Sequence, residues 1–145
     1  MTAPPPGPAG DDLVLRPIGR VRSSLADPAL APRQADEGAP TAWIDLDPAV
    51  VDGLRGVRAG DDVVVLTWLD RARRDVLVVH PRSDPDRPPT GVFATRSPER
   101  PNPVGLHPAR VVAVEGTHVQ VDGLEAIDGT PVLDIKPTLG DVDTR

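Results

Sequence analysis

Apolar residues occur along the chain in short runs, separated by segments rich in proline, glycine and aspartate. Residues 42–46 alternate apolar and polar side chains, the period-two pattern of a half-buried strand. The runs 62–69 and 75–80 are rich in valine and leucine, and with only residues 70–74 between them they predict a hairpin. The first run is continuously apolar, which predicts that both of its faces are buried.

Strands are also predicted near both ends of the chain. Residues 13–21 predict a first strand, which Pro17 places at an edge or a bend because proline lacks the N–H donor of a central strand. Residues 109–114 and 118–121 flank a glycine-containing turn and predict a short hairpin. Residues 131–135 follow an Asp-Gly turn and predict a last strand.

One short helix of two or three turns is predicted between residues 47 and 56. Asp47 can accept hydrogen bonds from free N–H groups as the N-cap, Pro48 suits the first helical position, and Gly56 can end the helix. Many short strands with one short helix are typical of a mainly β fold. We therefore expect a single small β-barrel-like domain with long loops.

The predicted domain spans residues 13–138. Residues 1–12 carry nothing to bury and are expected to form a disordered N-terminal tail, and residues 139–145 a flexible C-terminal tail. Residues 23–40 have little apolar content and predict a long loop, of a length at which loops are usually functional or disordered.

The chain is organised around residues 90–106, which contain three prolines between positions 98 and 103. These prolines fix φ and remove three N–H donors, so that neither a helix nor a central strand is expected there. The pattern predicts a stiff loop whose backbone carbonyls are free for a ligand and which presents Arg96 and Arg100 on a rigid support. An ordinary proline-rich connection explains the same pattern about equally well.

Charge changes the picture at the centre of the chain. The protein has 145 residues, enough for one domain, and a net charge of −6, which is not typical of a nucleic-acid-binding protein. Between residues 71 and 100, however, seven arginines face four acidic residues. This cluster, which includes Arg71, Arg73 and Arg74, predicts either a phosphate-contacting patch or a salt-bridged, solvated face.

Several kinds of site are not predicted. The absence of cysteine excludes disulfides, thiolate metal sites and a catalytic thiol. His80, His107 and His118 are scattered without ligand spacing, so no metal site is expected; His107 could face the central loop, but a surface position is favoured. No glycine-rich phosphate motif follows a strand. Without a signal-peptide pattern or a run long enough for a membrane helix, a soluble, cytoplasmic protein is expected.

The last predicted strand carries charged residues. Asp134 and Lys136 are two positions apart and therefore point to the same side of a strand. They predict either a structural ion pair or a carboxylate placed beside a cationic ligand.

Five segments, spread over roughly residues 15–138, match one known pattern in the same order. They are Ile18–Ser23, Pro32–Gln34, Trp68–Leu77, Gly91–Leu106 (GVFATRSPERPNPVGL) and Asp128–Pro137 (DGTPVLDIKP). In these segments the chain resembles the TsaA-like (TrmO) family of S-adenosylmethionine-dependent tRNA methyltransferases.

The resemblance implies a homodimer that binds S-adenosylmethionine near residues 96–105 and 128–136. Asp134 and Asp128 become candidates for the catalytic carboxylate, because a carboxylate can stabilise a sulfonium or accept the proton that an attacking amine loses. Carried over residue by residue, the resemblance implies cofactor-binding roles for Arg33, Gln34, Arg96, Ser97, Arg100, Asn102, Gly105, Asp128 and Lys136.

The implied activity is N6-methylation of the modified adenosine next to the tRNA anticodon. On this interpretation Arg71, Arg73 and Arg74 contact the RNA. The chain ends at Arg145, and we expect no extra C-terminal domain of the kind that some family members carry.

Three positions depart from the family pattern. The usual aromatic residue after Ser-Pro is Glu99, the usual histidine after Trp-Leu is Asp70, and the usual tyrosine after Lys-Pro is Thr138. One phenylalanine, two tryptophans and no tyrosine also leave few rings on which a base could stack. A small-molecule amine or other metabolite is therefore the alternative methyl acceptor, and a non-catalytic cofactor-binding module is a third interpretation.

Overall fold

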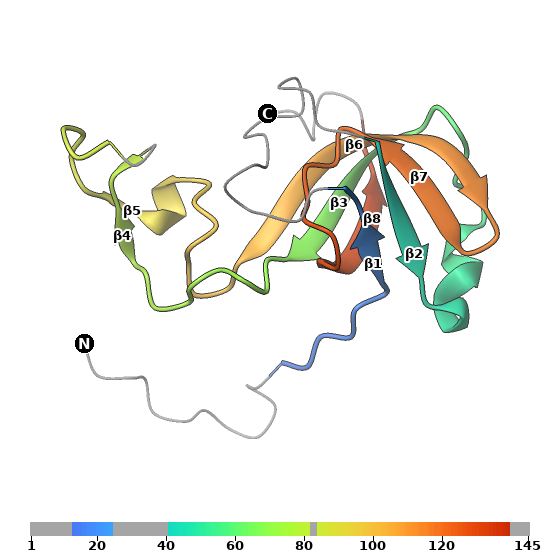
Figure 1. The fold of residues 1–145 in the computed structure, drawn as a ribbon, viewed down its shortest axis with the longest axis horizontal. Helices are drawn as coiled ribbons and strands as arrows, with labels where there is room; N and C mark the ends of the chain where they lie inside the picture. The colour runs from blue at the N-terminus through green and yellow to red at the C-terminus, as the bar shows by residue number, and fades with distance from the viewer. Residues whose placement is uncertain (1–12, 25–40, 82–83, 140–145) are drawn as a thin grey trace.

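The computed structural model describes residues 13–24, 41–81 and 84–139. Six strands form a closed antiparallel barrel in the order β1-β2-β7-β6-β3-β8 (Figure 1). The prediction of a mainly β, barrel-like fold is confirmed. The barrel strands are β1 (Gly19–Arg22), β2 (Ala42–Leu46), β3 (Asp62–Trp68), β6 (Val104–Glu115), β7 (His118–Asp122) and β8 (Pro131–Pro137).

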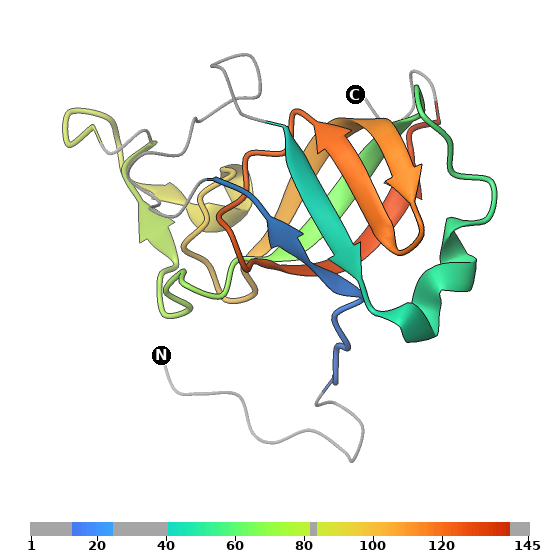
Figure 2. The same cartoon turned by 45° about the vertical axis from the view of Figure 1, so that its right-hand side comes forward.

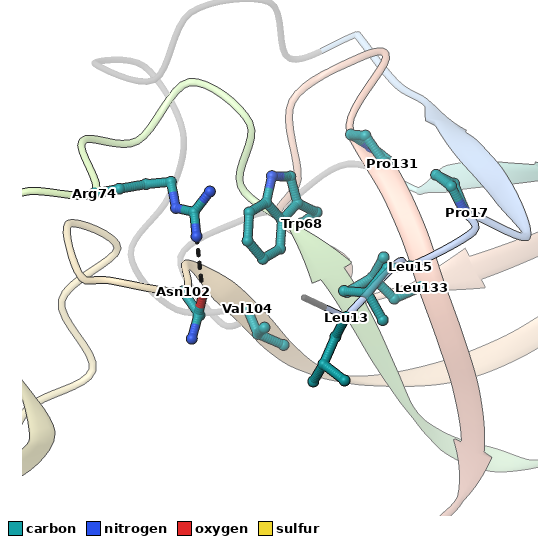
Figure 3. A pocket seen from close by; sticks show the side chains of 9 residues that line it. All are labelled: Leu13, Leu15, Pro17, Trp68, Arg74, Asn102, Val104, Pro131 and Leu133. Atoms are coloured by element: carbon teal, nitrogen blue, oxygen red, sulfur yellow. Dashed lines mark hydrogen bonds between the residues drawn. The ribbon is translucent and has the colours of Figure 1, made fainter. Parts of the chain in front are cut away.

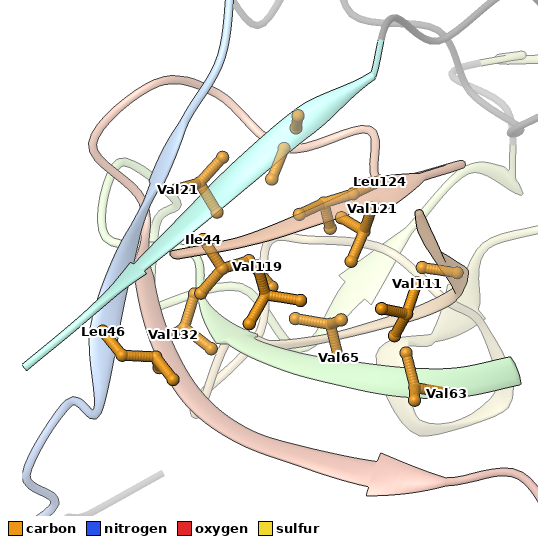
Figure 4. Close-up of a cluster of buried hydrophobic side chains, with 13 residues drawn as sticks. Val21, Ile44, Leu46, Val63, Val65, Val111, Val119, Val121, Leu124 and Val132 are labelled. Carbon is orange, nitrogen blue, oxygen red and sulfur yellow. The ribbon is translucent and has the colours of Figure 1, made fainter. Parts of the chain in front are cut away.

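Aliphatic side chains fill the barrel because alternate positions of each strand point inward (Figure 4). Along β3 the inward positions Val63, Val65 and Thr67 are buried, whereas Val64 and Leu66 between them are only half-buried. The prediction that this run is buried on both faces was therefore wrong: one face lines the core and the other forms the outside of the barrel. The buried cluster comprises Val21, Ala42, Ile44, Leu46, Val63, Val65, Ala109, Val111, Val119, Val121, Leu124, Ala126 and Val132.

The helix predicted after β2 is present as a 3-10 helix, η3 (Pro48–Leu54). Asp47 caps it as predicted, since its carboxylate accepts a hydrogen bond of 2.9 Å from the backbone N–H of Ala49. Gly56 follows the helix with φ of 91°, a conformation that favours glycine. The predicted hairpin of β6 and β7 and the turn at Gly129 are also confirmed.

Residues 62–69 and 75–80 do not form the predicted hairpin. Strand β3 pairs instead with β6 and β8, and only β4 (Val78–Val79) forms in the second run, where it pairs with β5 (Thr90–Gly91). The physical reason lies in the intervening arginines. The side chain of Arg74 binds the backbone of Pro101, so the chain leaving β3 follows the central loop rather than turning back along the strand.

The first strand is shorter than predicted. Residues 13–18 precede β1 without forming a strand, and the first strand-like hydrogen bond runs from Ile18 N–H to Val132 C=O at 2.8 Å. Strand β1 then packs closely on β2. A Cβ atom on Gly19 would lie 2.3 Å from the carbonyl oxygen of Asp45, so this position needs glycine for the two backbones to approach.

Residues 69–103 leave the barrel between β3 and β6 and form an excursion beside it (Figures 1 and 2). The excursion contains β4, β5 and a short 3-10 helix, η5 (Val92–Ala94). Its last residues are the central loop, which ends earlier than predicted because β6 already begins at Val104. Within the described part of the chain, no helix is long and apolar enough to cross a membrane.

Some predictions concern residues outside the described ones. They are the N-terminal tail 1–12, residues 25–40 of the predicted long loop, which include Arg33 and Gln34, and residues 140–145 of the C-terminal tail.

Candidate functional site

Side-chain hydrogen bonds hold the central loop in place. The guanidinium of Arg100 donates to two backbone carbonyls, those of Val92 and of Thr95, the latter at 2.9 Å. The hydroxyl of Thr95 accepts from the Ser97 N–H at 3.1 Å, and the Ser97 hydroxyl accepts from the Glu99 N–H at 3.3 Å. Arg100 is therefore turned into the loop, and of the two arginines expected on its surface only Arg96 is exposed.

A second arginine fastens the loop to the segment after β3. Arg74 donates from Nε to the Pro101 carbonyl at 2.7 Å and from Nη2 to the Asn102 side-chain oxygen at 3.0 Å (Figure 3). Its guanidinium also lies over the Trp68 ring, 5.1 Å from the centroid. The backbone N–H of Arg73 donates to the Glu99 carboxylate. Residues 70–74 and 99–102 are thus joined as one unit.

These contacts change the view of the loop backbone. The sequence predicts carbonyls left free by the prolines, but those of Val92, Thr95 and Pro101 accept from arginine side chains. The carbonyls of Asn102 and Pro103 accept from backbone N–H groups. Hydrogen bonds hold the loop in place, but they use its carbonyls, so a ligand would meet mainly side chains.

Two hollows open at the end of the barrel that faces the excursion. The first, about 420 Å³, brings together four predicted cofactor residues: Arg96, Ser97, Arg100 and Gly105. The second, about 380 Å³, shares part of its wall with the first. The shared residues are Leu69, Pro98, His107 and Glu125.

The second hollow contains two positions at which the chain departs from the family pattern, Asp70 and Glu99. A third carboxylate, Glu125, also borders it, and its Oε2 atom is buried. One arginine, Arg71, lines the same wall. This hollow is consequently acidic, a feature that the separate positions in the sequence did not reveal.

His107 lies at the junction of the two hollows, and the prediction of a surface histidine was wrong. It occupies an inward position of β6, opposite Val65 on β3. The hydroxyl of Thr67, itself fully buried, lies 2.8 Å from the ring nitrogen Nε2. Burial lowers the pKa of His107 to about 4. The inward alternation of Ala109 and Val111, continued back along the strand, is the sequence signal that could have located this residue.

Gly105 has a structural reason to be glycine. A Cβ atom there would lie 2.4 Å from the hydroxyl of Thr67 and 2.6 Å from Nε2 of His107. The missing side chain therefore makes room for the Thr67–His107 hydrogen bond. The resemblance implies a cofactor-binding role for this residue, and its place on the wall of the first hollow is compatible with that role.

Two more depressions surround the same loop on the outside of the barrel. One, about 480 Å³, lies between Trp68, Asn102 and Val104 on one side and Leu13 and other apolar residues on the other (Figure 3). The second, about 490 Å³, is bordered by Arg96 and by Phe93, whose side chain is 84% exposed. The sequence analysis did not predict that Phe93, at the start of the loop, is exposed.

Neither predicted catalytic carboxylate lines the two hollows, although Asp128 follows Ile127, which lines the second. Asp134 forms a 3.1 Å ion pair with Lys136, which the sequence offered as one of two possibilities. Asp134 is opposite Leu66 on β3, two strand spacings or roughly 10 Å from β6. Asp128 accepts a hydrogen bond from the Ser23 N–H at 3.0 Å and so ties the chain after β1 to the turn before β8.

The arginine cluster is largely engaged within the protein. Arg73 pairs with Asp75 at 3.0 Å and Arg87 with Asp84 at 3.8 Å. Arg74 binds the central loop. This arrangement favours the salt-bridged face over an open phosphate-contacting patch. In the described residues, no group of three or more histidine, cysteine, aspartate or glutamate side chains could hold a metal ion.

Comparison with known proteins connects this site to a family. Residues 20–144 match the model of the tRNA-methyltransferase O N-terminal domain. Two Archaeoglobus fulgidus proteins are similar. One, named a probable S-adenosyl-L-methionine-binding protein, is 42% identical over 90% of this chain and 35% of its own length. The other, named an S-adenosyl-L-methionine-binding protein, is 38% identical over 90% of this chain and 93% of its own length.

Solved structures give the same assignment. The structure of TrmO from Pseudomonas aeruginosa is 30% identical, with a TM-score of 0.75, over 92% of this chain and 59% of that protein. The chain thus spans about three fifths of that structure and about a third of the first Archaeoglobus protein. Because the domain model covers most of the sequence and the fold agrees, the chain belongs to the tRNA-methyltransferase O family, which it matches through the family's N-terminal domain.

Proposed function

We propose that this chain binds S-adenosylmethionine against the central loop and transfers its methyl group to an acceptor. The observation that carries the proposal is the first hollow, whose wall contains Arg96, Ser97 and Gly105 together. Its volume of about 420 Å³ lies within the range of small-molecule sites. Two relatives are named for binding S-adenosyl-L-methionine, which supports the same ligand here.

The side chains around the loop fit the groups of this cofactor. The exposed guanidinium of Arg96 suits a carboxylate, and the Ser97 hydroxyl and Asn102 amide offer hydrogen bonds to a ribose or an adenine edge. Leu69 and Leu106 supply apolar wall for a planar base. Polar groups at the rim and apolar groups on the walls are the usual composition of a nucleoside site.

When bound, the cofactor supplies a methyl group activated by a sulfonium. The chain's own task is to hold the methyl acceptor in line with the bond that breaks, which needs a rigid wall more than a reactive side chain. The clamps by Arg74 and Arg100 provide that rigidity, because a preformed loop loses little entropy on binding. Asp128 and Asp134 stay predictions for the carboxylate that receives the displaced proton.

As the methyl acceptor we propose N6 of the modified adenosine next to a tRNA anticodon. The family model is described as a tRNA-methyltransferase domain, which supports an RNA substrate. The exposed ring of Phe93 beside Arg96 offers a face on which an unpaired base can stack. Arg71, Arg73 and Arg74 stay predictions for RNA contacts, and such an acceptor implies a cytoplasmic place of action.

A small-molecule amine is the second candidate, and the second hollow favours it. Asp70, Glu99 and Glu125 border this hollow with one arginine, so its wall is negative. Such a wall attracts an amine or ammonium group and repels the phosphates of RNA. The amine would enter beside Pro98, which belongs to both hollows.

We also propose that two copies associate as a two-fold symmetric homodimer. The depression shown in Figure 3 is lined mainly by apolar residues, and Leu13, Leu15 and Val104 on its wall are 84%, 56% and 40% exposed. A second copy would cover this surface. Because Arg74 and Asn102 border the same depression, the cofactor loop would lie close to the interface. Light scattering that finds a monomer at tens of micromolar with cofactor present would contradict the dimer.

Calorimetry tests the cofactor site. The wild-type protein should bind S-adenosylmethionine in the micromolar range, and Arg96→Ala or Asn102→Ala should weaken binding by roughly 1–3 kcal/mol through loss of a hydrogen bond to a charged or polar group. Arg87→Ala is the matched control, because Arg87 pairs with Asp84 outside the hollows. Unchanged affinity in both site variants would show that the cofactor binds elsewhere.

Methyl transfer from labelled cofactor to total tRNA and to a metabolite extract tests the acceptor. The tRNA is taken from a strain without this protein, so that the proposed position is still unmethylated. We expect transfer to this tRNA. Transfer to the extract alone would replace the RNA acceptor with a small molecule. Cofactor binding without transfer to either would leave the non-catalytic module as the function.

A further inference from the structure

The interior of the barrel changes from apolar to polar at one end. The inward residues of β3 run Val63, Val65, Thr67, and their partners on β6 run Ala109, His107, Gly105. Most of this interior is aliphatic, but Thr67 and His107 stand at the end that opens into the two hollows. A histidine placed among core residues is costly unless its polar atoms have partners, so its presence calls for an explanation.

Only one of the two ring nitrogens of His107 has a hydrogen-bond partner in the part of the fold that the structure describes. Nε2 lies 2.8 Å from the buried hydroxyl of Thr67, with Gly105 packed against both. The other ring nitrogen, Nδ1, has no hydrogen-bond partner among the described residues. It is also not among their polar side-chain atoms that are both buried and without a partner. The hollows that His107 lines are the open space next to its ring.

The imidazole is uncharged around neutral pH, because burial lowers its pKa to about 4. A neutral imidazole has one N–H donor and one acceptor nitrogen. The Thr67 bond fits either direction, and we assign the tautomer in which Nε2–H donates to Thr67, which leaves the lone pair on Nδ1. The residue then presents a fixed hydrogen-bond acceptor at the junction of the hollows, while Thr67 and Gly105 hold the ring in one orientation.

We propose that His107 is a substrate-binding residue whose Nδ1 accepts a hydrogen bond from the N–H of the methyl acceptor and orients that nitrogen. This inference rests on the proposed methyl transfer and adds a residue that positions the acceptor. In the transfer, the nitrogen lone pair forms the new N–C bond. The C–S bond breaks with its electron pair going to sulfur, and the nitrogen loses its proton through water to the carboxylate base, for which Asp128 and Asp134 stay the predictions. His107 is neutral before and after the step.

Two substitutions separate this role from a purely structural one. A glutamine side chain reaches the position of Nε2, so His107→Gln keeps the bond to Thr67 and loses the Nδ1 contact. An asparagine side chain reaches the position of Nδ1, so His107→Asn loses the bond to Thr67 and keeps the contact with the substrate. Thr67→Val is the matched control, because it removes the structural bond without changing the imidazole.

The experiment measures thermal stability, S-adenosylmethionine affinity and steady-state transfer to total tRNA for the full chain and each variant. We expect His107→Gln to keep its stability and cofactor affinity but to lose about 10- to 100-fold in kcat/KM for the RNA. We expect His107→Asn to be less stable but within about 5-fold of wild-type kcat/KM. The reverse order, or equal activity of both variants, would overturn the proposal.

A second measurement tests the role of His107 even if the wild type transfers no methyl group. The chain, saturated with S-adenosylhomocysteine, is titrated with an anticodon stem-loop RNA and, separately, with adenosine, while NMR follows the two nitrogens of His107. A shift of Nδ1 larger than that of Nε2 is expected with at least one of these probes. No shift with either would overturn the role of His107, whereas absent turnover with a shifted Nδ1 would overturn only the proposed methyl transfer.

Discussion

The barrel and the excursion of residues 69–103 are held together by different forces. In the barrel, strand ladders close a ring around a continuous aliphatic core. In the excursion, Val92 and Pro103 are the buried residues among those described, and arginine side chains bonded to carbonyls fix the backbone. The barrel is stabilised mainly by burial of apolar surface and the excursion by a few charge-assisted hydrogen bonds. In a site between the two regions, the barrel side is fixed by many apolar contacts. The excursion side depends on a few hydrogen bonds, so one substitution can change it.

The largest effect is expected in the barrel. Ile44→Ala removes a fully buried side chain and should lower the free energy of unfolding by about 2–5 kcal/mol, because the ring of strands cannot collapse around the cavity. Val112→Ala on the outside, where the side chain is 45% exposed, is the control and should cost much less. Urea denaturation measures both. Equal losses would mean that the core does not dominate the stability of the barrel.

The difference between the two regions also explains what the sequence could predict. Barrel strands such as 42–46 are recognisable because each inward position must be apolar, which leaves a period of two. The excursion leaves no such period: its shape depends on which carbonyl Arg74 and Arg100 reach, and arginines at those positions look like a solvated basic patch. The predicted hairpin of residues 62–80 failed for this reason.

The candidate site, too, could be predicted only in part from the sequence. The family motifs locate Arg96, Ser97 and Gly105 on one hollow. They give no indication of His107, which follows the last matched residue, Leu106; only the inward alternation of Ala109 and Val111, continued back along the strand, points to it. The clustering of Asp70 with Glu99 depends on contacts between residues far apart in the chain, which no local pattern encodes.

The second largest effect is a pH dependence at the junction of the two regions. The pKa of His107 is about 4 in the folded protein and near its ordinary 6.5 when unfolded, so the unfolded chain binds more protons between these values. The contribution of His107 to the free energy of unfolding is therefore fully present above pH 6.5 and is lost as the pH falls toward 4. Over that range the loss should reach at most about 3 kcal/mol.

His107→Gln removes this titration and should flatten the corresponding part of the curve in urea denaturation between pH 7 and 4. The comparison of the two curves isolates His107 from the charged groups that line the same hollows. These groups are Asp70, Arg71, Arg96, Glu99, Arg100 and Glu125. Parallel curves for the two proteins would show that His107 titrates normally.

A smaller, local effect is expected within the excursion. Arg100→Ala removes the bonds to the carbonyls of Val92 and Thr95, so local opening of the loop should become easier by about 1.5–3 kcal/mol. Hydrogen exchange should accelerate at the Thr95 and Ser97 N–H groups and remain unchanged in β3 and β6. Exchange that accelerates equally in the barrel would show that the excursion and barrel unfold as one unit.

The smallest effect decides what Arg74 does. Arg74→Lys keeps the positive charge but loses the fork that reaches Pro101 and Asn102 together. If Arg74 is a clamp, cofactor affinity should fall by about 3- to 10-fold while the salt dependence of tRNA binding stays the same. If it contacts a phosphate, lysine should substitute for it, and Arg74→Gln should reduce the salt slope by about 0.7–0.9, the value of one lost phosphate contact. Since Nε and Nη2 of Arg74 already bind loop oxygens in the structure, we expect the first result, which would leave Arg71 and Arg73 as the predicted RNA contacts.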